Sequence, residues 1–394
     1  MRYKPFQDLN LSTLGMGNMR LPIVGERGPI DQEKARAIIE RAYHAGVNYF
    51  DTAYRYHGGE SEGFVGKALS QFPRDTWYLA SKMPGHMMNY KDGKLGFQGY
   101  LAGEEVKSIA SIFEEQLEKC GVDYFDFYLL HNVCESSFAF YTNEELGVVR
   151  YLLEQKKAGK IRHLGFSAHG RADTIGKFLD HYPDTFEFVQ IQLNYLDWEL
   201  QDAKSKYQLL EDRGIPVVVM EPVRGGSLAN LRPDCQELLK ASRPDDSMAA
   251  WAFRFLQSLP GVQVVLSGMT TMEQLEENLQ LFSKDDPATD ADKALLRKVV
   301  ASMADLVPCT ACRYCCEACP QGLDIPKLIS MYNEANYNKS VGSLGFTLRA
   351  MGETELPSAC LGCGACQKLC PQNIAIPEVL GKFNNLLQDA KAQG

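Results

Sequence analysis

The chain has 394 residues and a formal net charge of −9 at pH 7, which is enough length for one large domain and a smaller one. No basic run or aromatic-interleaved Lys/Arg patch is visible, so nucleic acid is not expected as a partner, because phosphate binding requires clustered positive charge. The N-terminal segment lacks the apolar core of a signal peptide, and no stretch approaches the roughly 18 apolar residues of a membrane span. We therefore expect a soluble cytoplasmic protein with no membrane partner.

From residue 11 to about 285, short β-branched or aromatic runs alternate with amphipathic stretches, which is typical of βα units around a parallel sheet. The strand candidates are residues 11–17, 47–53, 77–82, 124–131, 161–167, 187–194, 215–222 and 262–268. The helical stretches between them include residues 31–46, 104–121 and 143–159. Several of these stretches end on glycine, as expected for a left-handed C-cap.

Eight such units predict an α/β protein with a closed (β/α)8 TIM barrel, a fold that typically takes roughly 250 residues. An open, doubly wound sheet is the alternative, but no G-x-G-x-x-G follows the first strand candidate. The barrel is expected over residues 1–290. Two connections exceed the usual length, residues 131–146 and 224–247. Both follow strand candidates, at the end where barrel active sites are built.

After a predicted helix at residues 291–306, the sequence contains one cysteine motif twice, C-x2-C-x2-C-x3-C-P. The first copy comprises Cys309, Cys312, Cys315 and Cys319, and the second comprises Cys360, Cys363, Cys366 and Cys370. This spacing is typical of bacterial ferredoxins, in which the fourth cysteine ligates the other cluster. We therefore predict two [4Fe-4S] clusters. One is held by Cys309, Cys312, Cys315 and Cys370, and the other by Cys360, Cys363, Cys366 and Cys319.

Structural zinc sites and disulfides are weaker interpretations of the motif, since zinc sites favour paired C-x2-C halves and make no use of the final Cys-Pro. Each motif is followed by an Ile-Pro step and an amphipathic stretch. Residues 291–394 are therefore predicted to form a small α-helical ferredoxin-like domain. The other cysteines are scattered, as in a reducing compartment, and Cys316 is either a packing residue or a spare thiolate.

Four polar residues near the ends of strand candidates form a possible catalytic set: Asp51, Tyr56, Lys82 and His131. Catalysis in a barrel uses side chains from several strands that meet at one face. Taken singly, Asp51 is equally well a turn cap, Lys82 a salt-bridge residue and His131 a buried core imidazole.

These residues and their surroundings, F-D-T-A-x-x-Y, G-K-A-L, S-K, L-L-H and G-F-S, resemble the aldo-keto reductase family over roughly residues 7–285. With the cysteine repeat, the chain resembles the subgroup that carries a C-terminal ferredoxin-like extension. The resemblance implies an oxidoreductase that interconverts a carbonyl and an alcohol. It implies that Tyr56 is the acid, that Lys82 lowers its pKa from the usual ~10, that Asp51 holds Lys82 and that His131 orients the carbonyl. Tyr54 is the rival phenol, but the family's five-residue step from the aspartate selects Tyr56.

The resemblance also implies contacts to a nicotinamide nucleotide. Ser167 and Gln190 match residues that bind the carboxamide, but Ala168 replaces an asparagine, and Met220 replaces a stacking aromatic residue. The other implied contacts are Pro222, Arg224, Gly225, Gly268, Gln274, Glu277 and Asn278. Gly268 and Gln274 stand where Lys and Arg usually clamp a 2′-phosphate, so the choice between NADP(H) and NAD(H) stays open.

Hydride transfer moves two electrons, whereas each cluster ordinarily carries one, and no flavin fingerprint is evident. Three functional classes therefore stay open. The clusters exchange electrons with a redox partner protein or another cofactor, or they serve structure and docking in a plain reductase, or the barrel is a non-catalytic scaffold in an electron-transfer or redox-sensing adaptor. The substrate, a small-molecule carbonyl or alcohol, depends on the two long loops and is not specified.

Overall fold

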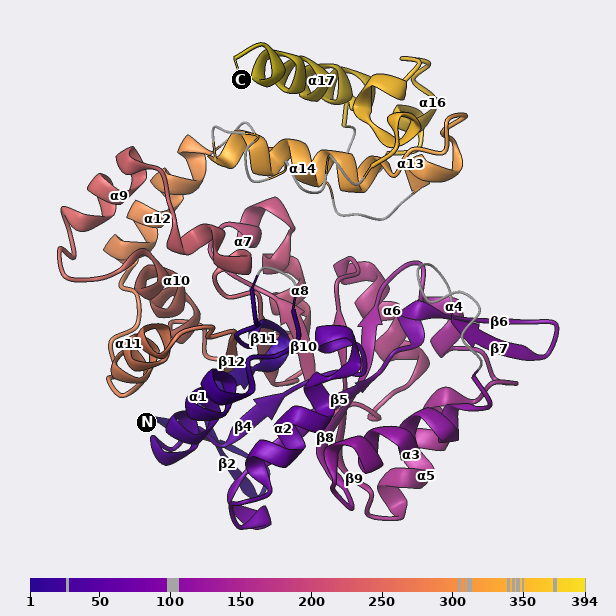
Figure 1. Ribbon diagram of the computed structural model, residues 1–394, viewed down its shortest axis with the longest axis vertical. Coiled ribbons are helices and arrows are strands. Elements are labelled where there is room, and N and C mark those ends of the chain that lie inside the picture. The colour runs from indigo at the N-terminus through magenta and orange to yellow at the C-terminus, as the bar shows by residue number, and fades with distance from the viewer. Residues whose placement is uncertain are drawn as a thin grey trace. The chain divides into compact units, whose positions relative to one another are not determined.

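The computed structural model describes residues 1–25, 28–97, 106–303, 306–307, 309, 314–338, 341, 344, 348, 351–370 and 374–393. The chain divides into two compact units (Figure 1). The first unit comprises Met1–Asn194, Ala203–Ala229 and Asp246–Thr289, and the second comprises Tyr195–Asp202, Asn230–Asp245 and Asp290–Gly394. The domain limits of 1–290 and 291–394 stay a prediction, and two short segments from within the first range belong to the second unit.

The first unit is built on a closed parallel barrel with the strand order β10-β11-β12-β3-β4-β5-β8-β9. Its strands are β3 (Leu14–Gly17), β4 (Tyr49–Asp51), β5 (Tyr78–Met83), β8 (Phe125–Val133), β9 (Ile161–Ala168), β10 (Val189–Gln192), β11 (Val217–Met220) and β12 (Val262–Ser267). Each predicted strand contains or overlaps one of these, so the (β/α)8 prediction is confirmed. Their β-branched and aromatic residues suit a sheet that is buried on both faces.

An antiparallel hairpin of β1 (Tyr3–Phe6) and β2 (Leu9–Ser12) precedes the barrel. The Phe6 ring packs against Phe127, His163 and Phe188, with ring centroids 5.5, 5.1 and 6.2 Å away. These three residues lie early in β8, early in β9 and just before β10. The Phe6 ring of the hairpin therefore covers the amino-terminal end of these strands.

The helices of the first unit follow the barrel strands in the chain. They are α1 (Gln32–His44), α2 (Ser61–Leu69), α3 (Ile109–Cys120), α4 (Phe138–Tyr141), α5 (Val148–Lys157), α6 (Ala172–His181), α8 (Ala203–Asp212), α10 (Met248–Gln257) and α11 (Met272–Phe282). Local sequence sets their ends: Asp31 caps α1, Ser108 caps α3, and Gly121 adopts the left-handed conformation after α3, as predicted.

A second hairpin, β6 (Met88–Lys91) and β7 (Lys94–Phe97), lies in the connection after β5 and was not predicted. Its turn residues Asp92 and Gly93 both have positive φ, at 52° and 73°. An Asp-Gly turn between apolar residues is a strong hairpin signal, so the sequence contained the information needed to find it.

The second unit is helical in the part that the structure describes, as predicted. Its helices are α7 (Asp197–Leu200), α9 (Pro233–Lys240), α12 (Asp290–Ser302), α13 (Tyr314–Glu317), α14 (Ile325–Asn338), α16 (Ala365–Lys368) and α17 (Ile376–Gln393). The two Ile-Pro steps form the first residues of α14 and α17, because proline is tolerated where a helix has no N–H partner. None of the described helices is long and apolar enough to cross a membrane.

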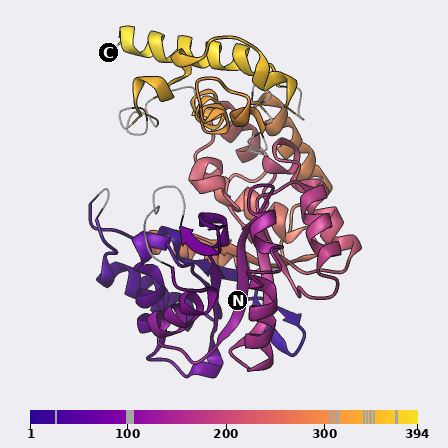
Figure 2. The same cartoon turned by 90° about the vertical axis from the view of Figure 1, so that its right-hand side faces the viewer.

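The two halves of the cysteine repeat share one core. Helices α14 and α17 pack against each other (Figure 2), and so do the short helices α13 and α16. The Tyr332 and Phe383 rings, one from each long helix, lie 6.0 Å apart within the buried cluster. The repeat in sequence is therefore a repeat in structure.

Candidate active site

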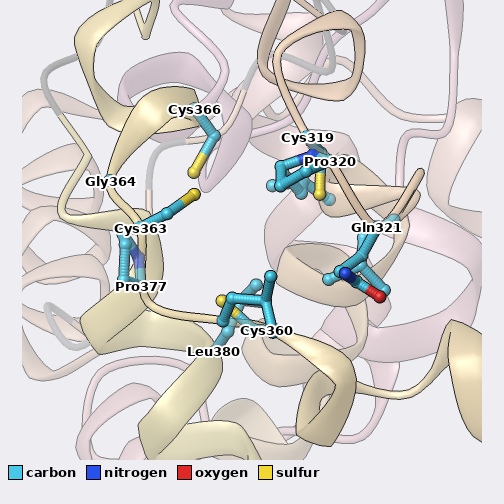
Figure 3. Close-up of a pocket in the computed structure, with 12 residues that line it drawn as sticks. Cys319, Pro320, Gln321, Cys360, Cys363, Gly364, Cys366, Pro377 and Leu380 are labelled. Carbon is cyan, nitrogen blue, oxygen red and sulfur yellow. The ribbon is translucent and has the colours of Figure 1, made fainter.

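Four cysteines, three of them from the second motif, line a common pocket. Its walls include Cys319, Cys360, Cys363 and Cys366, together with Leu323 and Leu380 (Figure 3). This set is the one predicted for the crossed cluster, because Cys319 comes from the first motif and the other three from the second. Burial raises the pKa of the Cys366 thiol, and Cys360 and Cys319 raise it further. Bound iron would favour the thiolate forms that mutual repulsion opposes.

The ligands predicted for the other cluster are only partly described. Cys315 is buried, and Cys309 and Cys370 are partly buried against the same core, whereas Cys312 lies outside the described residues. The Gln201 amide donates a 2.9 Å hydrogen bond to the Cys309 carbonyl. Cys316 packs against the core. Among the described residues, no three His, Cys, Asp or Glu side chains are placed to share a single metal ion.

In the barrel, the four predicted catalytic residues come from β4, β5, β8 and the turn after β4. Asp51 is the last residue of β4, Lys82 lies near the end of β5, and His131 lies near the end of β8. Tyr56 begins the short helix η2 (Tyr56–Gly59). Because parallel barrel strands end on the same face, these side chains are brought together there.

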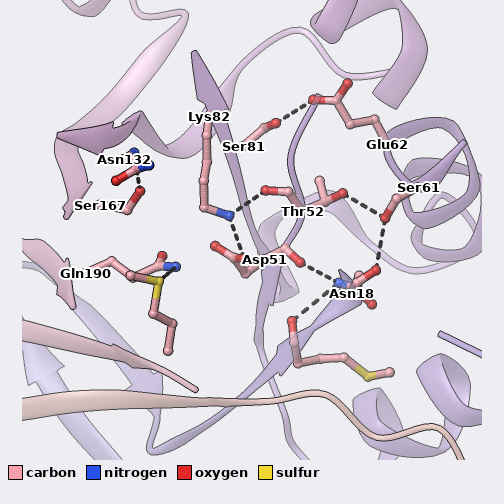
Figure 4. A network of polar contacts seen from close by, with 12 residues as sticks. Asn18, Asp51, Thr52, Ser61, Glu62, Ser81, Lys82, Asn132, Ser167 and Gln190 are labelled. Atoms are coloured by element: carbon pink, nitrogen blue, oxygen red, sulfur yellow. Dashed lines mark hydrogen bonds and ion pairs between the residues drawn. The ribbon is translucent and has the colours of Figure 1, made fainter. Parts of the chain in front are cut away.

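A buried ion pair joins Lys82 to Asp51 (Figure 4). The Lys82 Nζ donates to Asp51 Oδ1 at 2.6 Å and to the Thr52 carbonyl at 2.7 Å. Burial lowers the pKa of Lys82, but Asp51 and Tyr56 outweigh it, so the pKa lies above its ordinary value. Burial raises the pKa of Asp51, and Lys82 opposes that rise. Lys82 is therefore held as an ammonium ion beside Tyr56.

The Tyr56 ring lies near both this ammonium and His131. Lys82 Nζ is 5.0 Å from the Tyr56 ring centroid, and the His131 ring centroid is 6.0 Å from it in an edge-on arrangement. Burial raises the pKa of Tyr56, and Lys82 lowers it by less. The sequence predicted a lowered Tyr56 pKa. Lys82 does lower the pKa, but the net shift is upward because desolvation of the phenolate has the larger effect.

His131 is held neutral. Burial lowers its pKa well below the ordinary value, and the neighbouring His86, Lys82 and His169 lower it further. The His86 ring, from the connection after β5, lies 4.4 Å from the His131 ring centroid, and burial lowers the His86 pKa to about 4. A neutral imidazole donates one hydrogen bond and accepts one. Sequence reasoning did not single out His86 or His169.

Tyr54, the rival phenol, is bound to helix α3 instead. Its hydroxyl donates to Glu115 Oε2 at 2.9 Å. The cations of Arg55 and Lys119 lie 5.2 and 4.7 Å from its ring centroid. Burial and Glu115 raise the pKa of Tyr54 strongly. The phenol beside the Lys82–Asp51 pair is therefore Tyr56.

A buried polar network supports the strand that carries Lys82. The Gln116 amide of α3 donates to Glu62 Oε1 of α2 at 2.6 Å and to the Lys82 carbonyl at 3.1 Å. Ser81 also donates to Glu62, and the Tyr128 hydroxyl donates to Gln116 Oε1 at 2.5 Å. Burial raises the pKa of Glu62, which Ser81 and Gln116 oppose. Sequence reasoning missed this network, whose members are far apart in the chain.

The residues matched to carboxamide contacts lie on neighbouring strands. Gln190 of β10 is the register partner of Ser167 of β9. The Gln190 amide nitrogen lies 3.6 Å from the sulfur of Met220, which ends β11. The Ser167 hydroxyl accepts a 2.8 Å hydrogen bond from the Asn132 backbone N–H. The arrangement thus brings Ser167, Gln190 and Met220 onto neighbouring strands, and their role as cofactor contacts stays a prediction.

Most of the remaining implied cofactor contacts lie either just after β11 or on helix α11. Pro222 is buried, and Arg224 and Gly225 follow it in a turn with φ of 49° and 63°. Gln274 and Asn278 have structural partners: Gln274 completes the capping box of α11 with Thr271, and Asn278 donates to Ser267 Oγ at 3.0 Å. Glu277 is exposed on the same helix.

Arg20 was not predicted, yet it lies beside two of the implied contacts. A Cβ at Gly225 would meet an Arg20 guanidinium nitrogen at 3.0 Å, and a Cβ at Gly268 would meet Arg20 Cβ at 3.0 Å. The Glu221 carboxylate lies 3.6 Å from the same point at Gly225. Arg20 also lines a pocket with His57. The glycines leave room for this cationic side chain between two loops of the barrel mouth.

Comparison with known proteins gives matches over both parts of the chain. Residues 13–300 match the aldo/keto reductase family, and residues 308–375 match a 4Fe-4S dicluster domain. An NADH-specific methylglyoxal reductase from Escherichia coli (strain K12) is 27% identical over 331 residues, which cover 75% of this chain and 97% of that protein. L-galactose dehydrogenase from Arabidopsis thaliana is 27% identical over 288 residues, 69% of this chain and 84% of that protein. The holo form of aldo-keto reductase AKR11C1 from Bacillus halodurans superimposes with a TM-score of 0.60 and 26% identity, over 76% of this chain and 96% of that one.

Proposed function

Because the chain belongs to the aldo/keto reductase family and carries a 4Fe-4S dicluster domain, we propose that it interconverts a small-molecule carbonyl and its alcohol, with Tyr56 as the acid. The family membership makes it an oxidoreductase of the aldo-keto reductase type. The observation that carries the proposal is the buried Lys82–Asp51 pair, 2.6 Å between Nζ and Oδ1, next to the phenol of Tyr56.

The residues of the site divide the work of carbonyl reduction. A bound nicotinamide nucleotide supplies the hydride that reaches the carbonyl carbon. Negative charge then develops on the carbonyl oxygen, and Tyr56 donates its proton there. Its raised pKa keeps the phenol protonated before the reaction. Lys82 stabilises the phenolate that is left, and neutral His131 donates a hydrogen bond to the same oxygen.

Ser167 and Gln190 are proposed to bind the carboxamide of the nucleotide, and Met220 to cover one face of its ring. Arg20 is proposed to bind a phosphate of the same nucleotide, because its guanidinium lies beside Gly225. A guanidinium is well suited to phosphate through paired N–H donors. Neither Gly268 nor Gln274 provides a cation for a 2′-phosphate, so both NADH and NADPH are candidates.

The cysteines are proposed to bind two [4Fe-4S] clusters with crossed ligands. Cys319 shares its pocket with the first three cysteines of the second motif, which supports this assignment. Electron exchange between a hydride donor and one-electron clusters requires a relay that accepts two electrons together and passes them on one at a time. We propose a free flavin or a redox partner protein for that step. The alternative is that the clusters only stabilise the domain or dock a partner. It predicts that the nucleotide does not reduce them.

The proposal is tested on protein purified without oxygen. Iron, acid-labile sulfide and flavin are measured first, with about eight irons and eight sulfides per chain expected for two cubanes. Oxidation of NADH and NADPH is then followed against a panel of aldehydes and ketones. A protein with full clusters that binds neither nucleotide and reduces no carbonyl would refute the reductase proposal and favour an electron-transfer adaptor with a non-catalytic barrel.

Electron exchange is tested separately. The oxidised protein is mixed with NADH or NADPH, with and without substrate and free flavin, and the cluster absorbance and EPR signal are followed. Clusters that become reduced support electron transfer between the nucleotide and the clusters. Clusters that stay oxidised in every mixture, while carbonyl reduction proceeds, would leave them a structural or docking role.

A further inference from the structure

A β-bulge follows the strand segment that leads to His131. Leu130 of β8 pairs with Phe166 of β9, and Val133 pairs with Ala168, so three steps on β8 cover two on β9. The extra residue falls within His131–Asn132, and Asn132 adopts a φ of 58°. Asparagine is one of the few residues other than glycine that accept this conformation. Bulges redirect side chains and are common beside active sites.

Two amide oxygens beside Ser167 are buried without a hydrogen-bond partner among the described residues. They are Asn132 Oδ1 and Gln190 Oε1. Gln190 is the register partner of Ser167, and the Asn132 backbone N–H donates to Ser167 Oγ at 2.8 Å. Figure 4 draws Asn132 next to Ser167, with Gln190 on the same side of Lys82. Buried acceptors are normally paired, so two unpaired ones on residues that flank Ser167 favour a ligand with donors at this site.

The donors and acceptors of this cluster match a primary carboxamide. The Ser167 hydroxyl already accepts from Asn132, so its own hydrogen is available to donate. The cluster therefore offers one O–H donor and two amide acceptors, from Asn132 and Gln190. A carboxamide presents one oxygen acceptor and two N–H donors.

We propose that the Asn132 side chain is a third contact to the nicotinamide carboxamide, and that it takes the place of the asparagine missing at Ala168. The inference rests on the proposed function. The Ser167 hydroxyl donates to the carboxamide oxygen, while Gln190 Oε1 and Asn132 Oδ1 accept its two N–H groups. Ala168 pairs with Val133 across the strands, and its methyl side chain can make no hydrogen bond.

The test is Asn132→Gly in the full chain with its clusters. Glycine accepts the positive φ of residue 132 and keeps the backbone N–H that binds Ser167, so only the amide side chain is removed. Dissociation constants are measured by calorimetry for three probes. These are the nicotinamide nucleotide that the wild type binds best, the matching ADP-ribose, which lacks nicotinamide, and the 3-acetylpyridine analogue, in which a methyl replaces the NH₂ group.

The variant should bind the nicotinamide nucleotide about five-fold more weakly, the effect of one neutral hydrogen bond. Its affinity for ADP-ribose should be unchanged, and its affinity for the acetylpyridine analogue should change little, because that analogue has no N–H to lose. Asn132→Gly with Ala168→Asn should restore affinity for the nicotinamide nucleotide.

Three other results would overturn the inference. Unchanged affinity of Asn132→Gly for the nicotinamide nucleotide removes Asn132 from the carboxamide site and leaves the proposed function standing. Equal weakening for all three probes assigns Asn132 a purely structural role. A wild type with intact clusters that binds no nicotinamide nucleotide refutes the proposed function together with this contact.

Discussion

Replacing Lys82 with methionine should destabilise the barrel strongly. The Lys82 and Asp51 side chains are 0% and 3% exposed, so each is the other's main compensation for lost water. Removing one partner of a buried pair leaves an unpaired charge and costs about 3–5 kcal/mol of unfolding free energy. Removing both charges, with Lys82→Met and Asp51→Asn, should recover about 2 kcal/mol of that loss, because the double variant leaves no unpaired charge buried. The effects of the two substitutions on stability are therefore not additive.

The effect of Lys82→Met should depend on pH. Burial already raises the pKa of Asp51, and the Lys82 contribution that lowers it would be gone. A carboxyl whose pKa is higher in the folded than in the unfolded state binds its proton more tightly when folded. The stability it contributes is present below the unfolded pKa of about 3.9 and is lost as the pH rises through the folded pKa. The defect should therefore be smaller at pH 5 than at pH 8.

Urea unfolding of the barrel, followed by far-ultraviolet circular dichroism at both pH values, measures these changes. Lys177→Met is the matched control, since Lys177 and Asp173 form an exposed i,i+4 pair, with side chains 72% and 50% exposed, and such pairs contribute about 0–1 kcal/mol. A Lys82→Met variant no less stable than the control, or a double variant as unstable as the single one, would refute the buried-pair reasoning.

Three further predictions concern the proposed function. Tyr56→Phe should lower kcat for carbonyl reduction by about 10²–10⁴-fold with nearly unchanged nucleotide affinity, whereas Tyr54→Phe should keep most activity; the reverse ranking in steady-state assays would make Tyr54 the acid. Cys319→Ser should disrupt the cluster held by residues 360–366 and spare the other, and two normal EPR signals in the reduced variant would contradict the crossed ligands. Arg20→Ala should weaken nucleotide binding by about ten-fold through loss of a charge-assisted contact, and titrations that match the wild type would exclude Arg20 from the phosphate site.

Much of the fold was readable because its signals are local. The eight barrel strands lie in short β-branched or aromatic runs such as residues 215–222, and amphipathic helices alternate with them. Such patterns follow from the repeat of the backbone itself, which does not depend on distant residues. The cysteine motif is equally local, since a cluster needs its thiolates at set spacings along the chain.

The candidate catalytic set was predicted from polar residues at strand ends and from the family resemblance, but the direction of the Tyr56 pKa shift was not predicted correctly. The step from Asp51 to Tyr56 and the position of Lys82 at a strand end are features of sequence. The direction of the Tyr56 pKa shift is not a feature of the sequence. It depends on how deeply the barrel buries the phenol and on how close the phenol lies to Lys82. Burial is a property of the whole packed unit.

What the sequence determined by itself is therefore the element order, the cysteine spacing and the residue types at the strand ends. Only the tertiary structure decided which distant groups meet there. Gln116 reaches Glu62 across 54 positions of sequence, Arg20 lies beside Gly225 and Gly268, and the bulge at Asn132 appears only when β8 is paired with β9. These contacts join elements whose proximity is created by closure of the barrel, and no local pattern encodes that closure.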